Sequence, residues 1–259
     1  MNWLATADRD QVRWLTFDRP ERKNAIPANG WEPLRDAIED FSTSTQRVLV
    51  LTGADGDFCS GADIDPSRYE QMGSIEERHR RMKMVGSVIM ALCRLTKPTI
   101  AAVDGVAVGA GMNLALGCDL VIATDRARFA EIFVKRGLAV DSGGSWLLPR
   151  IVGLQRAKDL ALSGRIVDAD EALDIGLANE IVSPANLEAR VAEVAESLLA
   201  GAPLAQGLIK QMLNSSFGSS LADAVAWEGQ AQAVLMGSDD LIEGINAFAE
   251  KRDPQWKGR

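Results

Sequence analysis

A run of very small residues near the middle of the chain constrains its fold more than any other feature. Segment 105–114 reads Gly-Val-Ala-Val-Gly-Ala-Gly-Met-Asn-Leu and follows the apolar run Thr99–Val103. Glycine and alanine let a ligand approach the backbone closely, and the first N–H groups of a helix lack partners inside the helix. Because the helix dipole also favours negative charge there, the pattern predicts a turn and a helix that hold an anion or a developing oxyanion by main chain.

Two more turns of small residues occur elsewhere in the chain. Phe58–Ile64 follows a second buried apolar run by a few residues, and Asp141–Trp146 comes later. One such turn is a weak indication, because strand-to-helix connections often use Gly and Ala for tight packing. Two such turns after different strands indicate a ligand site more specifically.

Charge and cysteine content exclude several classes of function. The 259 residues carry a formal net charge of −8, which argues against nucleic acid as the main partner but allows an anionic small ligand. The three cysteines show no metal-ligand spacing and form no even set, so we expect reduced thiols, a cytoplasmic location and no metal. Charges at Asp8 and Arg9 precede any apolar stretch, and no apolar run is long enough to span a bilayer. We therefore expect neither a signal peptide nor membrane insertion.

Hydrophobic periodicity predicts an α/β core followed by a helical region. Helices are expected at 31–41 and 75–94, after Ala110, and from a cap at Asp168 to Gly176. Strands are expected at 12–17, 48–51, 99–103 and 120–123. Strands that alternate with helices are typical of an α/β core. From Leu187 to Phe248 the pattern indicates consecutive helices, so we divide the chain into residues 1–186 and residues 187–259.

Several segments in this order resemble the crotonase superfamily, also called the enoyl-CoA hydratase/isomerase family. The resemblance runs nearly from end to end. Its segments are Arg19–Ala25, Phe58–Ile64, Gly105–Cys118, Gly137–Gly153, Ala172–Ala178 with Ile181-Val182, and Phe248–Pro254. It implies an α/β fold built as a crotonase-type spiral of ββα turns, with a C-terminal helical region that packs trimers. It further implies an acyl-CoA thioester substrate, no separate cofactor because coenzyme A is part of that substrate, and a homotrimer or a dimer of trimers.

The resemblance also implies positions for the thioester and for the rest of CoA. Two backbone N–H groups that grip the thioester oxygen map to Ala62 and Ala110, next to Gly61 and Gly109. Such donors are worth about 3–4 kcal/mol each in acyl-transfer enzymes. The residues that would bind the remainder of the substrate are Arg22, Lys23, Ala25, Ser60, Asp63 and Ile64, with Phe248 and Lys251 reaching the CoA of a neighbouring subunit. Read without the family, Arg22 and Lys23 are a solvated polar loop, and Lys251 is a cation at a helix C-terminus.

Two positions depart from the pattern of the family's hydratases. Their two glutamates map to Asn113 and Phe133, and neither an amide nor a phenyl ring can move a proton. The usual two-glutamate hydration is therefore not expected. Phe133 would instead supply an apolar wall of the acyl pocket together with Trp146, and the Asn113 amide would hydrogen-bond near the ligand.

Asp141 is the remaining candidate for acid/base catalysis. It falls where ring-oxepin isomerases, dienoyl-CoA isomerases and a haloaryl-CoA dehalogenase of the family carry an aspartate. In an apolar pocket its pKa would rise from about 3.9, which suits moving a proton between the carbons of an enolate. Alternatively, Asp141 caps the helix that follows Ser142-Gly143-Gly144. The two roles are compatible.

Other reactive side chains have simpler interpretations. Glu131 could replace the missing glutamate if it shares a face with the neighbouring phenylalanines, but a surface or trimer-contact position is the simpler interpretation. His79, the single histidine, lies on a charged helix, which argues against a Ser-His-Asp hydrolase. Cys59 lies in the turn at Phe58–Ile64, and no histidine is near it in the sequence. Packing therefore explains Cys59 better than nucleophilic chemistry.

These residues favour double-bond or ring isomerisation through a thioester enolate, because a single group can return the proton that it removes. A second hypothesis makes Asp141 a nucleophile or water activator for hydration, hydrolysis, C–C cleavage or dehalogenation. A third makes the protein an acyl-CoA binder without catalysis. We expect the choice of acyl group to depend on residues 65–80.

Overall fold

A computed structural model describes residues 3–64 and 73–259, and a six-stranded sheet forms its centre. The strand order is β1-β2-β3-β4-β6-β8. β1 pairs with β2 in the antiparallel direction, and all other pairs are parallel. The strands are β1 (Leu4–Arg9), β2 (Val12–Phe17), β3 (Val48–Gly53), β4 (Thr99–Val103), β6 (Leu120–Thr124) and β8 (Glu180–Val182).

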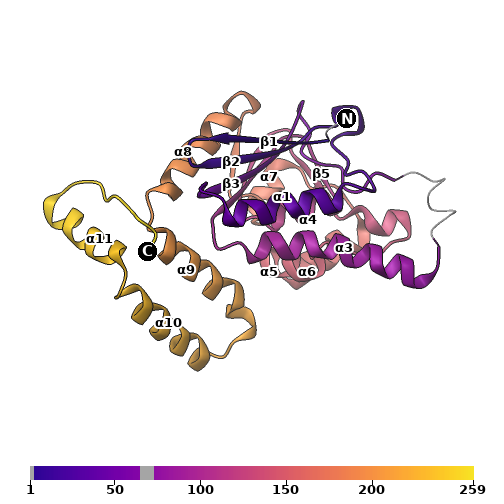
Figure 1. The fold of residues 1–259 in the computed structure, drawn as a ribbon. Coiled ribbons are helices and arrows are strands. Elements are labelled where there is room, and N and C mark those ends of the chain that lie inside the picture. Colours follow the sequence, from indigo (N-terminus) through magenta and orange to yellow (C-terminus); the bar gives the residue numbers. More distant parts are fainter. Residues whose placement is uncertain (1–2, 65–72) are drawn as a thin grey trace.

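Helices cover both faces of this sheet because its strands alternate apolar side chains between the two faces. In β3, Val48 and Val50 pack with Val191 and Ala195 of α8 (Leu187–Leu199). Leu49 and Leu51 point into a larger core on the opposite face, formed with α1 (Trp31–Thr43), α3 (Ile75–Arg94) and α4 (Ala110–Leu116). Figure 1 shows α1 and α3 lying side by side along that face.

A second, narrower ladder brings the small-residue turns together. Its strands β5 (Val106–Val108) and β7 (Arg128–Ala130) are parallel. Isolated bridges extend it on both sides, pairing Ile26 with Ala62, Cys59 with Ala107, and Phe129 with Val167. The turn at 58–64 therefore lies directly beside the turn at 105–111.

Short helices complete the body around the two sheets. They are the 3₁₀ segment η2 (Ile132–Arg136), α5 (Gly144–Val152), α6 (Leu154–Ser163) and α7 (Ala169–Asp174). The predicted cap of α7 is confirmed, because the Asp168 side chain accepts the N–H of Glu171. Within the described residues, no helix is long and apolar enough to cross a membrane.

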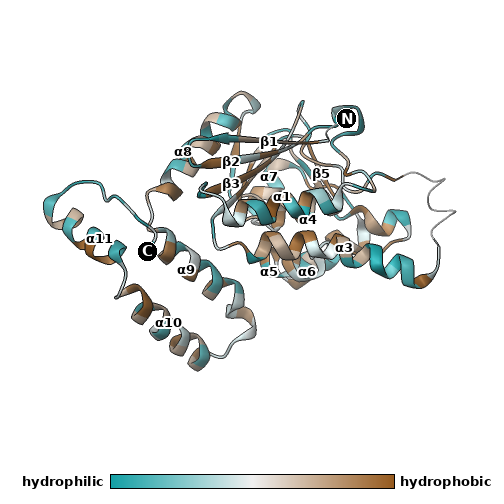
Figure 2. Ribbon diagram, viewed as in Figure 1, coloured by the Kyte–Doolittle hydropathy of each residue, from teal (hydrophilic) through white to brown (hydrophobic). Residues whose placement is uncertain are grey.

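Three C-terminal helices project from one side of the body (Figure 1). They are α9 (Pro203–Ser215), α10 (Leu221–Leu235) and α11 (Asp239–Glu250). Figure 2 shows apolar residues along all three. The chain then returns toward α8 and α9, where the Trp256 Nε1–H donates to the Ala200 carbonyl at 2.7 Å and the buried Asp240 carboxyl accepts the N–H of Lys257 at 2.6 Å.

Candidate active site

The turns at 58–64 and 105–111 are joined main chain to main chain. The Cys59 N–H donates to the Val106 carbonyl at 2.8 Å, and the Cys59 carbonyl accepts the Val108 N–H at 3.0 Å. Gly61 has φ of 88°, and a Cβ there would lie 2.8 Å from the Val108 oxygen. A side chain at Gly111 would clash with the Cys59 carbonyl. Glycine at these two positions is therefore what allows the turns to touch.

This contact leaves two predicted N–H donors close together. Ala62 follows Gly61, and a Cβ at Gly61 would be only 3.4 Å from the Ala110 nitrogen. Neither the Ala62 N–H nor the Ala110 N–H has an acceptor within residues 3–64 and 73–259. Ala110 is the first residue of α4, so its N–H belongs to those that a helix leaves unsatisfied. Gly109, with φ of 57°, makes the turn and donates its own N–H to the Ala130 carbonyl at 2.8 Å.

Both donors line one cavity of about 400 Å³, and Asp141 and Phe133 line it too. Most of its wall is apolar, which lowers the local dielectric constant and strengthens electrostatic interactions inside it. The other lining residues within the described chain include Ile26, Trp31, Ser60, Asp63, Ile64, Met82, Val85, Leu138 and Val140. Residues 65–72, part of the segment expected to select the acyl group, lie outside the described residues.

Asp141 lies on a loop whose backbone is strongly turned. Ser142 has φ of 48° and Gly143 has φ of 81°. The Asp141 side chain is partly buried, and its Oδ1 accepts the Ser142 hydroxyl at 2.9 Å. Burial raises the pKa of Asp141 above its usual value, and the Ser142 hydrogen bond opposes part of that rise. The alternative role of Asp141 as a helix cap is wrong, because Gly143 is the N-cap residue of α5 and no side chain caps it.

Asn113 lies beneath this loop rather than at the cavity surface. It is 0% exposed, and its Nδ2 donates to the main-chain carbonyl of Asp141 at 2.9 Å. A Cβ at Gly144 would lie 2.5 Å from the same Nδ2, so the start of α5 packs directly on the amide. Asn113 does not line the cavity. The expectation that it binds the ligand is therefore wrong, and its contacts instead hold the Asp141 loop.

Glu131 is fully buried, and the simpler interpretation of it as a surface acid is wrong. It follows β7, between the strand and η2. Neither carboxyl oxygen has a hydrogen-bond partner within the described chain. Burial, with a smaller contribution from the negative charge of Asp141, raises the pKa of Glu131 to about 8, and the Asn113 side chain opposes part of that rise. The one signal in the sequence was the possible shared face with the neighbouring phenylalanines, and Phe129 and Phe133 are indeed buried as well.

The polar loop predicted to bind CoA lies at one side of the cavity. Asp63 accepts Arg22 at 2.7 Å and Arg19 at 3.0 Å. Burial raises the pKa of Asp63, but these two guanidinium groups outweigh it and hold that pKa below its usual value. Lys23 is exposed and lies 3.9 Å from the Asp57 carboxylate.

Two further hydrogen bonds from side chains to main-chain carbonyls shape this loop. One of its buried residues was not singled out from the sequence. Ala25 offers its carbonyl to Arg19 at 3.0 Å, and the Ser60 hydroxyl donates to the Arg22 carbonyl at 3.1 Å. The missed residue is Asn24, which is 0% exposed and whose amide donates to the carbonyls of Ala54 and Asp57. An asparagine in a run of charged residues was the available signal.

Trp146 does not line this cavity within the described chain, and its predicted part in the acyl pocket stays a prediction. It lies in a groove between α5 and α9, where the Arg150 guanidinium stands 3.9 Å from its ring centre and 5.4 Å from that of Phe217. In α5, Leu147 and Leu148 turn to the core, which directs Trp146 outward.

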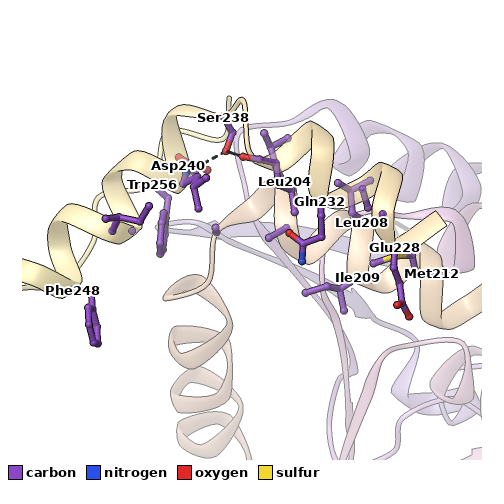
Figure 3. Close-up of a pocket in the computed structure, with 18 of the residues that line it drawn as sticks. Leu204, Leu208, Ile209, Met212, Glu228, Gln232, Ser238, Asp240, Phe248 and Trp256 are labelled. Carbon is purple, nitrogen blue, oxygen red and sulfur yellow. Dashed lines mark hydrogen bonds between the residues drawn. The ribbon is translucent and has the colours of Figure 1, made fainter. Parts of the chain in front are cut away.

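Phe248 and Lys251 lie at α11, at the far end of the projecting helices. Phe248 is 88% exposed and borders an apolar cavity of about 860 Å³ between α9, α10 and α11. Figure 3 shows Leu204, Leu208 and Met212 of α9 along this cavity. Neither Phe248 nor Lys251 lines the cavity that holds Asp141. Their contact with the CoA of a neighbouring subunit stays a prediction.

Two other reactive side chains lie where the sequence placed them. His79 is exposed on α3. Cys59 is buried, and this burial raises the pKa of its thiol to about 12, so the reactive thiolate is scarce at neutral pH.

Comparisons with known proteins agree on a family and differ on the reaction. Residues 8–259 match the family model for enoyl-CoA hydratase/isomerase. The chain is 36% identical to the 1,2-epoxyphenylacetyl-CoA isomerase of Escherichia coli (strain K12), covering 100% of both chains. It is 34% identical to the 4-chlorobenzoyl coenzyme A dehalogenase-2 of Arthrobacter sp, covering 96% of this chain and 91% of that one. Among solved structures, an enoyl-CoA hydratase from Bacillus anthracis superposes with a TM-score of 0.93 at 29% identity, covering 100% of both chains.

Proposed function

The chain belongs to the enoyl-CoA hydratase/isomerase family, and on that premise we propose that it isomerises an acyl-CoA thioester through an enolate. Ala62 and Ala110 would donate their N–H groups to the thioester oxygen. Because these N–H groups have no acceptor in the described chain, they are available to a substrate without breaking an existing bond.

Asp141 would move the proton between two carbons of the substrate. The described lining of the cavity contains two carboxyl groups, Asp63 and Asp141. Asp63 is paired with Arg19 and Arg22, which makes it a weak base. No cation is among the groups that shift the pKa of Asp141. Burial raises this pKa, which brings the Asp141 carboxylate closer to the proton affinity that a general base needs. This contrast between the two carboxyl groups is the observation that carries the proposal.

A single general base suits isomerisation better than hydration. Hydration needs one group to activate water and another to protonate the α-carbon, whereas isomerisation lets one carboxyl return the proton that it removed. Phe133 stands where the family's hydratases have a glutamate, and a Cβ at Gly109 would lie 3.6 Å from its ring. An apolar ring there would exclude water from the part of the cavity next to the Ala62 and Ala110 N–H groups.

The rest of the substrate would extend toward the polar loop. Arg22 and Lys23 lie on the side of Asp63 and Ile64, and Arg81 and Arg136 add positive charge to the cavity lining. Coenzyme A would arrive as part of the substrate, so no separate cofactor is proposed. We place the reaction in the cytoplasm.

A homotrimer, or a dimer of two trimers, would cover the apolar faces of α9 to α11. Several large apolar side chains there are mostly exposed in one chain, among them Val225, Val234, Ile242, Ile245 and Phe248. Residues 187–259 would thus serve as the assembly region beside the core of residues 1–186. In this arrangement Phe248 and Lys251 would approach the CoA of the neighbouring subunit.

The decisive experiment separates binding from proton transfer. Wild type and Asp141→Asn are incubated with a panel of aliphatic and aromatic enoyl-CoA thioesters in deuterated water. Deuterium uptake at the α and γ carbons is followed by mass spectrometry, and affinity is measured by calorimetry. We expect Asp141→Asn to lose exchange by a factor of about 10²–10⁴ while affinity changes little.

Other outcomes identify the rival functions. Undiminished exchange in Asp141→Asn would remove Asp141 from the mechanism. Binding without exchange by wild type on every thioester would favour the non-catalytic acyl-CoA binder. Release of halide or free acid would favour Asp141 as a nucleophile or water activator, the class to which the related dehalogenase points.

A further inference from the structure

The two oxygens of the Asp141 carboxyl group have different surroundings. Oδ1 accepts the Ser142 hydroxyl at 2.9 Å. Oδ2 has no hydrogen-bond partner within the described chain, and it is not among the polar atoms there that are both buried and unpaired. Because the Asp141 side chain lines the cavity, Oδ2 is the oxygen that a substrate can reach.

The main chain of Asp141 is held separately from its side chain. The Asp141 carbonyl accepts the Gly144 N–H at 3.0 Å and the Asn113 Nδ2 at 2.9 Å. With the backbone held, the carboxyl group can still turn about its terminal torsion, which has a broad energy minimum in aspartate. Among the described residues, the Ser142 hydroxyl makes the one hydrogen bond that restrains this rotation.

We propose that Ser142 is a positioning residue for Asp141, whose hydroxyl donates to Oδ1 and thereby presents Oδ2 to the substrate as the reactive oxygen. A carboxylate can only accept hydrogen bonds, so the hydroxyl must be the donor whenever Asp141 is ionised, the state that a base requires. Ser142 does not line the cavity and acts through Asp141. Its role in catalysis rests on the proposed function, whereas the hydrogen bond does not.

The backbone of Ser142 is a second observation in favour of this role. Its φ of 48° lies in the left-handed region, which glycine adopts freely and other residues adopt at a cost. The next residue, with φ of 81°, is glycine. Residues held in such conformations cluster at active sites, where the surrounding structure fixes them. A serine at this position has what a glycine would lack, a hydroxyl beside the carboxyl group.

Burial makes the hydrogen bond effective. Ser142 is 5% exposed, so water competes little for its hydroxyl. The bond opposes the burial that raises the pKa of Asp141, and it therefore keeps more of this carboxyl ionised. The other charged groups that face Asp141 are Glu131 after β7, Asp63 of the turn at 58–64, Arg81 of α3 and Arg136 of η2. None of these four is among the groups that shift the pKa of Asp141.

A titration without substrate tests the hydrogen bond. The carbon NMR resonance of the Asp141 carboxyl group, assigned by its loss in Asp141→Asn, is followed against pH. The pKa of Asp141 should be higher in Ser142→Ala and Ser142→Gly than in wild type, because the ionised form loses a donor. Ser145→Ala removes an exposed hydroxyl of α5 outside the cavity lining and should leave this pKa unchanged. An equal pKa in wild type and both Ser142 variants would overturn the proposal whatever the enzyme's reaction is.

Kinetics test the positioning role, with the thioester on which wild type exchanges fastest. Both Ser142 variants should lower kcat about 10-fold on its pH-independent plateau with KM little changed, because a rotating carboxyl group presents Oδ2 correctly for less of the time. The acid limb of kcat/KM should move to higher pH. Ser142→Gly should melt at a higher temperature than Ser142→Ala, because glycine suits a φ of 48°. Equal kinetic losses in the two variants would therefore exclude instability as their cause.

Three results would contradict the positioning role. A plateau kcat equal to that of wild type in both variants would refute it even if the pKa of Asp141 moves. A loss confined to Ser142→Ala would assign the effect to backbone strain. Exchange by wild type on no thioester would refute the proposed reaction and the catalytic role of Ser142 with it, while the titration would still decide whether the hydroxyl binds the carboxylate.

Discussion

The Asn113 amide holds the main-chain carbonyl of Asp141 at 2.9 Å, while the carboxyl group of the same aspartate lines the cavity. The loop is thus fixed through its backbone, and the reactive group needs no support from Asn113. We expect Asn113→Leu to lower the free energy of unfolding by about 1–3 kcal/mol, because the Asp141 carbonyl loses one of its two donors and a leucine would crowd the start of α5 at Gly144. Urea unfolding measures this change. Met112→Leu, one residue away and also buried, is the matched control and should cost less than about 1.5 kcal/mol.

The proposed oxyanion donor on α4 can be removed with only a small apolar addition to the side chain at Ala110. Ala110→Pro deletes its N–H, and proline is tolerated at the first position of a helix. Gly109 can precede proline because its φ is 57° and its ψ −124°, a conformation open to glycine. We expect kcat to fall by a factor of about 10²–10³, as for loss of one oxyanion donor. Ala110→Gly, which keeps the N–H, should lose far less; equal losses in the two variants would remove this donor from the mechanism.

Glycine at position 61 should be indispensable, in contrast to a glycine in open space. In Gly61→Ala the added Cβ would press on the Val108 carbonyl, and alanine would have to adopt a φ of 88°. We therefore expect a destabilisation of about 1–3 kcal/mol and loss of activity. Gly86 lies in α3 with nothing within 4 Å of its added Cβ. Gly86→Ala should therefore stabilise the protein by about 0.5–1 kcal/mol. Thermal melts of both variants measure the contrast, and a neutral Gly61→Ala would refute the close contact of the turns.

Stability should decline with pH in a window set by Glu131. Its pKa is about 8 in the folded chain and near 4.5 when unfolded, so the folded state holds an extra proton between these values. Stability is therefore highest below pH 4.5 as far as this group is concerned, and is lost as pH rises toward 8. Comparing urea midpoints of wild type and Glu131→Gln from pH 5 to 9 isolates the effect. The gap should move in favour of Gln as pH rises; a constant gap would contradict the raised pKa.

Assembly through the C-terminal helices can be tested with one charge. Ile245 on α11 is 59% exposed and lines the cavity between α9, α10 and α11. We expect Ile245→Asp to convert trimers into monomers in light scattering coupled to size exclusion, because a carboxylate would be buried at the contact. Ile75→Asp changes an exposed residue of α3, which is not one of the C-terminal helices, and should leave the assembly intact. A monomeric wild type would contradict the proposed trimer itself.

Much of the fold was predictable because its signals are local. The helix predicted at 75–94 and the strand predicted at 99–103 are confirmed at those bounds, since each has a clear apolar period and a clear stop. The consecutive helices predicted from Leu187 to Phe248 are confirmed as α8 to α11, which run from Leu187 to Glu250. The family and its crotonase fold are confirmed by the comparisons. β1 was missed because five of its six residues are exposed or half-buried, which leaves little alternation to detect.

The site was predictable where its geometry follows from main chain, and less so where side chains from distant segments meet. The turns of Ala62 and Ala110 follow from their glycines. The position of Trp146 depends on the rotation of α5, which turns this ring into the groove beside α9. Glu131 is 0% exposed, and the alternation with its neighbouring phenylalanines left burial and a surface position both open.

The paired main chains of Cys59, Val106 and Val108 have a consequence for redesign of this protein. They set the spacing of the two proposed oxyanion donors, the Ala62 and Ala110 N–H groups, by a peptide ladder that does not depend on the side chains of the cavity wall. A library that randomises wall positions such as Met82, Val85 and Leu138 should therefore change which acyl group fits without disturbing the polarisation of its carbonyl. If the proposed site is correct, we expect substrate range and catalytic power to be separately adjustable in this chain.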